Sequence, residues 1–276
     1  MYVRAGYHND MIKNGGTKTV VDSGESKLAM QPSKQSSVDS ELTIEEIIHI
    51  LFWPPTIKLD TLTSAQKMEH WEMEYDYYVL IHEAEARRLL LNLAVKLPAD
   101  SVIVDSGAHV GDTGIPLAQS LREAGRSDVY VLMVEPDASK VSWITKKISS
   151  VGNLQASAIN SGLYSNTTRA NILRSDAHPS GWVILPNVAD GEIQLRSVAD
   201  ILAAERPRDV FGLWHLDVEG SELNALQGLG AHRPHFILME TKRNNKDATL
   251  AEEYLVSLGY KPMRRLGLDV LFELQG

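Results

Sequence analysis

A glycine-rich stretch is the first part of the chain whose residue types could do chemistry. Asp105 ends the apolar run 102–104, and Gly107, Gly111 and Gly114 follow it. Glycine lets a backbone approach a ligand closely because it has no Cβ. The spacing differs from the dinucleotide fingerprint, and no lysine is present to meet a phosphate as in a P-loop. An acid beside such a turn suits a positively charged ligand, such as the sulfonium and amino group of S-adenosylmethionine, although the glycines could also simply pack a helix on a strand.

A second acidic residue, Glu135, ends the next apolar run. An acid about 20 residues beyond a glycine turn commonly binds the ribose of an adenosine ligand. A carboxylate can accept both ribose hydroxyl protons, whereas Asp137 better suits the alternative role of an acid at a helix N-terminus. Asn160 and Ser161 follow the third apolar run, 154–159, and could contact the adenine or form an ordinary turn.

A third group combines a histidine with several acids. His215, Asp217 and Glu219 lie on one face of a predicted strand, since side chains alternate along a strand. Unpaired charges are costly to bury, so this pattern indicates a site rather than packing. His215 has an ordinary pKa that suits a general base, while Asp217 could be that base or bind an amino group. Glu219 or Glu240 could orient a substrate.

These acids also raise the question of a metal. Asp217, Glu219 and Glu240 offer the oxygen ligands that hard cations prefer. Their spacing in the sequence does not require a cation, and no metal is predicted. A lone histidine such as His215 is more often structural than catalytic, so both roles stay open.

The elements that must position these residues alternate between strand and helix from Ser101 onward, which predicts an α/β fold with a mostly parallel sheet and helices on both faces. The runs 260–263 and 268–272 are expected to form a C-terminal antiparallel hairpin. Between 165 and 192 the pattern is irregular, and we expect a substrate-facing loop with short strands.

Two segments precede this α/β domain, which is expected to span 99–276. Residues 1–40 are polar and rich in Gly, Ser and Lys, which predicts a disordered tail. Residues 41–98 contain two capping boxes and are predicted to be helical. Aromatic residues at near-helical spacing, Trp71 and Tyr75 among them, could cover a site, but the core is the favoured place for such a stripe.

Composition limits the partners. The formal net charge is −9, the isoelectric point is near 5.5 and no basic cluster occurs, which argues against nucleic acid as a partner. Cysteine is absent, which excludes disulfides and thiolate metal sites. No apolar run is long enough to span a bilayer, and no secretory signal is evident. We expect a cytoplasmic protein with no membrane partner; the oligomeric state is not predicted.

Three motifs carry a resemblance: the turn Val104-Asp-Ser-Gly-Ala-His-Val-Gly111, the strand end Val134-Glu-Pro136, and Leu216-Asp-Val-Glu-Gly-Ser-Glu222. In these motifs, and in Leu238-Met-Glu240, the chain resembles the FkbM-type S-adenosylmethionine-dependent methyltransferases over residues 101–274. The third motif is the most specific. The chain departs from the family pattern at His109, where asparagine is common, and at His215, where lysine is frequent.

The resemblance implies a Rossmann-like methyltransferase fold, S-adenosyl-L-methionine as cofactor, and O-methylation of a hydroxyl on a small molecule such as a sugar or polyketide. The alternative is a catalytically inactive methyltransferase-like binding or scaffold protein; an oxidoreductase is disfavoured by the glycine spacing. The predicted catalytic residues are Asp217, His215 and Glu240. The predicted cofactor-binding residues are Asp105, Ser106, Gly107, Ala108, His109, Gly111, Glu135, Pro136, Asn160, Ser161 and Asp217.

Overall fold

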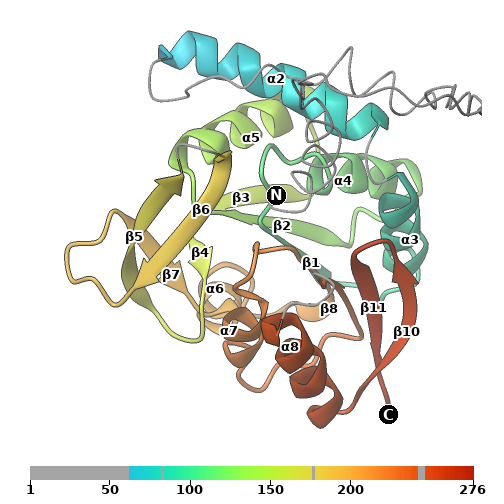
Figure 1. The fold of residues 1–276 in the computed structure, drawn as a ribbon. Coiled ribbons are helices and arrows are strands. Elements are labelled where there is room, and N and C mark those ends of the chain that lie inside the picture. Colours follow the sequence, from blue (N-terminus) through green and yellow to red (C-terminus); the bar gives the residue numbers. More distant parts are fainter. Residues whose placement is uncertain (1–61, 82–83, 176–177, 242–245) are drawn as a thin grey trace, which may run out of the picture. The chain divides into compact units, whose positions relative to one another are not determined.

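A computed structural model describes residues 62–81, 84–175, 178–241 and 246–276 (Figure 1). All of them belong to one unit of the chain, residues 53–276. The predicted tail 1–40 and the first predicted helix, which would begin at Thr43, lie outside the described residues. Those two predictions, and the boundaries expected for the segment 41–98, therefore stay predictions.

The centre of the fold is a seven-stranded sheet with the order β10-β11-β9-β8-β1-β2-β3 (Figure 1). Strand β1 is buried along its whole length between β2 and β8, as expected for a nearly continuous apolar run in a parallel sheet. The parallel strands are β1 (Ser101–Ser106), β2 (Tyr130–Glu135), β3 (Ala156–Asn160), β8 (Val210–Leu216) and β9 (Phe236–Glu240). The predicted C-terminal hairpin is confirmed as β10 (Tyr260–Leu266) and β11 (Asp269–Leu274), with β11 antiparallel to β9.

Helices cover both faces of this sheet, as predicted. On one face Val102 and Val104 belong to a buried apolar cluster that includes Ile201 and Leu226. The helices of that face are α6 (Val198–Glu205), α7 (Glu222–Gln227) and α8 (Lys246–Ser257). On the other face α4 (Gly114–Glu123) begins against Met133, and α5 (Ala138–Val151) packs beside it on β2 and β3.

The irregular stretch 165–192 contains more structure than predicted. It holds the long antiparallel pair β5 (Thr168–Ser175) and β6 (His178–Pro186), which joins β4 (Gly162–Leu163) and β7 (Ile193–Arg196) in a second sheet of order β4-β7-β5-β6. The expected strands are therefore present, but the expected loop is a β-ribbon. Its register depends on pairing with β7 and on the small apolar cluster formed there, neither of which the local sequence reveals.

The N-terminal helices are α2 (Ser64–Ile81) and α3 (Ala84–Ala94), within the segment predicted to be helical. The capping box ahead of α2 is confirmed, because the backbone N–H of Thr63 donates to Gln66 Oε1 at 2.9 Å. Trp71 and Tyr75 are buried, and the Tyr75 ring lies 5.3 Å from the Trp143 ring of α5. These two aromatic residues are core, as favoured. Among the described residues, no helix has the length and apolar character needed to cross a membrane.

Candidate functional site

The carboxyl ends of the central parallel strands bring the predicted site residues to one edge of the sheet. In the register of the strands, Asp105 stands opposite His215, and Glu135 stands opposite Asn160. Asp217 follows β8, and Glu240 ends β9 beside it. Ligands of open α/β sheets bind at this edge, so the predicted residues share the place where a cofactor would lie.

The glycine turn is fixed between β2 and β8. Gly107 has a φ of +74°, and a Cβ there would lie 1.7 Å from the carbonyl oxygen of Asp217. The backbone N–H groups of Gly107 and Ala108 both donate to the carbonyl of Val134, at 3.0 and 3.1 Å. Gly111 also has a φ of +74° and packs against Ile115 of α4. The structure thus gives both glycines a packing reason in addition to the predicted ligand contact.

His109 and Glu135 are joined within this turn. His109 has a φ of +51°, a left-handed conformation that asparagine, aspartate and histidine tolerate best among non-glycine residues. That geometry suits histidine as well as the asparagine that the resemblance leads us to expect at this position. The backbone N–H of His109 donates to Glu135 Oε2 at 2.9 Å, and that of Asp137 donates to Oε1 at 2.9 Å.

Glu135 retains capacity for a ligand. Its side chain is buried, and this burial raises the pKa of the carboxyl above its usual value. Each carboxylate oxygen accepts one backbone N–H in the contacts above, and each has a further lone pair to offer. Two hydroxyl donors, such as those of a ribose, would fit this remaining capacity.

His215 and Asp105 form a buried pair that the sequence alone does not predict. His215 Nδ1 lies 2.7 Å from Asp105 Oδ1, and both residues are less than one-tenth exposed. Burial alone would lower the pKa of His215, but the hydrogen bond with Asp105 and the negative charges of Asp105, Asp269 and Asp217 raise it to about 10. A raised pKa favours the protonated ring, which makes His215 a weaker candidate for the base than Asp217; its catalytic role stays a prediction.

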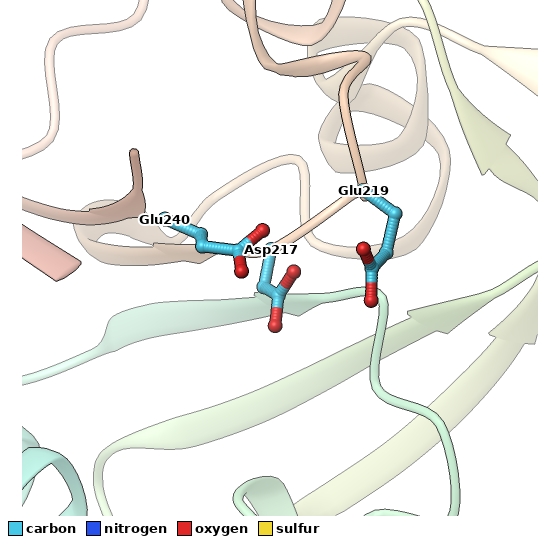
Figure 2. A group of neighbouring side chains, drawn as sticks. All are labelled: Asp217, Glu219 and Glu240. Atoms are coloured by element: carbon cyan, nitrogen blue, oxygen red, sulfur yellow. The ribbon is translucent and has the colours of Figure 1, made fainter. Parts of the chain in front are cut away.

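The carboxylates of Asp217, Glu219 and Glu240 gather beyond β8 and β9 (Figure 2). One ligand atom from each lies within 4.8 Å of the others. Asp217 Oδ1 is shielded from solvent and has no hydrogen-bond partner among the described residues. Such a set could hold an ammonium group or a hard divalent cation. The three carboxylates do not by themselves choose between these ligands.

The remaining predicted residues are mostly held by the fold itself. The side chain of Asn160 donates to the carbonyl oxygens of Glu135 and Pro136, at 3.2 and 2.8 Å, and so ties β3 to the end of β2. The buried hydroxyl of Ser106 accepts an indole N–H from β8 at 2.7 Å. The hydroxyl of Ser161 is also buried and lies 2.9 Å from a neighbouring carbonyl. Their contact with a cofactor stays a prediction.

A residue near the glycine turn that the sequence does not single out is Glu74. Glu74 of α2 places its Oε2 atom 3.3 Å from His109 Nε2 and its Oε1 atom 3.3 Å from His70 Nε2. Burial alone would raise the pKa of Glu74, but His109, His70 and Lys140 together lower it to about 2. The i, i+4 spacing of His70 and Glu74 was visible in the sequence, whereas the contact with His109 depends on how α2 packs.

Comparison with known families decides the assignment. The chain matches the family described as methyltransferase FkbM domain over residues 105–262, more than half of its length and including the turn, Glu135, Asp217 and Glu240. The chain belongs to the FkbM methyltransferase family. S-adenosylmethionine is accordingly the cofactor of this FkbM-family protein, which is an S-adenosylmethionine-dependent methyltransferase by family.

Solved structures similar to this FkbM-family chain are methyltransferases of low sequence identity. The O-methyltransferase NovP is 11% identical, with 70% of this chain and 79% of that chain covered and a TM-score of 0.45. A methyltransferase from Geobacter sulfurreducens is 14% identical, with 77% and 92% covered and a TM-score of 0.44. A precorrin-6y C5,15-methyltransferase from Geobacter metallireducens is 12% identical, with 79% and 97% covered and a TM-score of 0.43. No curated protein matches the chain by sequence.

Proposed function

We propose that this protein transfers the methyl group of S-adenosylmethionine to a hydroxyl of a small molecule, such as a sugar, a polyketide or a similar metabolite. The observation that carries the proposal is the Asp217 carboxylate at the end of β8, whose Oδ1 atom is shielded and has no hydrogen-bond partner among the described residues. A hydroxyl nucleophile must lose a proton, so its methylation needs a base within hydrogen-bond reach.

The residues at the sheet edge fit the cofactor. Glu135 has acceptor capacity for the ribose hydroxyls, and the turn from Gly107 to His109 lies directly beside it. Asn160 extends the same edge at the end of β3. When bound, the cofactor supplies a methyl group on a positively charged sulfur, which is already a strong electrophile. The protein therefore has mainly to align the acceptor and exclude water.

The chain's own groups would divide the remaining work. Asp217 would take the proton that the acceptor hydroxyl loses when it receives the methyl group that the cofactor would supply. Glu240, 8% exposed and beside Asp217, would orient the acceptor hydroxyl. Pairing with Asp105 raises the pKa of His215 and favours the protonated ring, which supports a role in holding β1 and β8 together rather than in proton abstraction.

Asp217→Asn tests this assignment. If Asp217 is the base, the variant should bind S-adenosylhomocysteine within about threefold of wild type and should lose turnover by roughly two to four orders of magnitude, the range for a lost general base. Binding is measured by calorimetry, and turnover by transfer of a labelled methyl group to a panel of hydroxylated metabolites. A variant that loses affinity and turnover together would instead make Asp217 the anchor of the cofactor's amino group.

A further inference from the structure

Helix α2 (Ser64–Ile81) precedes the residues that match the family model, which begin at 105. It nevertheless contacts the glycine turn at His109. Glu74 is the residue that makes the contact, through the 3.3 Å approach of its Oε2 atom to His109 Nε2. The side chains of Glu74 and His109 are only 13% and 18% exposed. Solvent screens such a pair much less than it screens a surface ion pair.

Glu74 is itself held in place. Its second oxygen, Oε1, lies 3.3 Å from Nε2 of the buried His70, one helical turn earlier. On the opposite side of the His109 ring, Nδ1 lies 3.8 Å from Asp112 Oδ1. The imidazole of His109 therefore lies between two carboxylates, and the one from α2 is the closer.

The contact reaches Glu135 through the backbone of His109. The same residue whose ring faces Glu74 donates its backbone N–H to Glu135 Oε2 at 2.9 Å. It does so in a left-handed conformation, with φ at +51°. Sparsely populated conformations of this kind persist where the surrounding structure holds them. A side-chain anchor on His109 thus helps to fix the N–H that orients Glu135.

The position of α2 is set independently of this contact. Tyr75 packs against Trp143 of α5, and Lys147 of α5 forms an ion pair with Glu72 and lies 4.7 Å from the centre of the Tyr75 ring. Glu72 therefore contributes to the docking of α2 without touching the turn. It provides a matched control for Glu74, because both are glutamates of one helix and both pair with a basic side chain.

We propose that Glu74 is a positioning residue of the cofactor site: through His109 it fixes the turn that orients Glu135 toward the ribose of S-adenosylmethionine. Helix α2 then contributes to cofactor binding in addition to packing against the rest of the domain. This inference rests on the proposed function in one respect, namely that Glu135 binds the cofactor.

The test is a double-mutant cycle on the full chain, with S-adenosylhomocysteine as the probe and calorimetry as the readout. Glu74→Gln should weaken binding about tenfold, within the range for coupled neighbouring side chains. Glu72→Gln should leave affinity within about twofold of wild type. In a His109→Asn background the shorter side chain removes the contact between Glu74 and the glycine turn, so Glu74→Gln should then have little further effect on affinity. Steady-state kinetics should show a raised KM for S-adenosylmethionine with kcat nearly unchanged.

Three results would overturn the proposal: unchanged affinity in Glu74→Gln, an equal loss in Glu72→Gln, or a full effect of Glu74→Gln in the His109→Asn background. Thermal unfolding of each variant confirms that it is folded at the temperature of the titration. If Glu74→Gln fails to fold, Glu74→Asp, which keeps the charge but withdraws it from His109, takes its place in the same cycle. A wild-type chain that binds no S-adenosylhomocysteine would instead overturn the proposed function itself.

Discussion

At the scale of single residues, the pairing of His215 with Asp105 decides how a proton is held at the sheet edge. His215 Nδ1 lies 2.7 Å from Asp105 Oδ1, and both residues are less than one-tenth exposed. Because the carboxylate stabilises the charged ring, the pairing raises the pKa of His215 and favours its protonated form.

The pair predicts how stability depends on pH. The pKa of His215 is raised from 6.5 to about 10 in the folded state, so the native protein binds a proton that the unfolded chain releases. The stability from this group is fully present below about pH 6.5 and falls as pH rises toward 10. Urea unfolding, repeated at intervals of about one pH unit between pH 6 and 10, measures this loss of stability.

A double variant provides the control for that measurement. His215→Gln with Asp105→Asn replaces the pair by neutral amides and leaves no buried charge without a partner. Its free energy of unfolding should change less between pH 6.5 and 10 than that of wild type. Equal pH dependence in the two proteins would contradict the raised pKa of His215.

Residue types at the site can be predicted from the sequence more readily than their partners. Residue type and spacing indicate Asp217, Glu135 and the glycine turn, because an acid after an apolar run marks a strand end. The pairing of His215 with Asp105 cannot be predicted in this way, since it depends on the register between β1 and β8, strands far apart in the sequence.

At the scale of elements, the sequence predicts most of the main sheet, because its strands are local apolar runs bounded by polar residues. The β5–β6 ribbon was only partly predicted, since its pattern depends on pairing with β7. The contact of α2 with the turn follows from side-chain packing on α5, which no local pattern encodes.

Also at the scale of elements, Gly107 is the glycine least able to accept a side chain. A methyl group there would lie 1.7 Å from a backbone oxygen of Asp217, and the backbone φ of +74° already disfavours other residues. Gly107→Ala should therefore cost at least about 2–4 kcal/mol, the sum expected for backbone strain and overpacking. Gly125 has a similar φ of +72°, but no atom lies within 4 Å of the place a methyl group would take, so Gly125→Ala should cost only about 1 kcal/mol. Urea unfolding of both variants separates strain from steric overlap, and equal losses would refute the close approach of Gly107 to the Asp217 backbone.

At the scale of the whole molecule, the cofactor site combines residues from inside and outside the family match. The matched residues 105–262 supply the turn, Glu135 and Asp217, while α2 adds Glu74 from outside the match. Strand β11 also lies outside it and places Asp269 near His215. Ligand binding should therefore stabilise the folded unit as a whole.

This coupling predicts a thermal shift that depends on Glu135. S-adenosylhomocysteine at about 100 times its Kd should stabilise the wild-type chain by about 2.7 kcal/mol, because it binds only the folded state. For a chain of this size that corresponds to a rise in Tm of roughly 5–10 °C. Glu135→Ala removes acceptors of charge-assisted hydrogen bonds and should weaken binding by about 1.5–3 kcal/mol. At the same ligand concentration most of the rise should then disappear. Glu123→Ala, at an exposed position at the end of α4, is the matched control and should keep the full rise; a full rise in Glu135→Ala as well would remove Glu135 from the cofactor site.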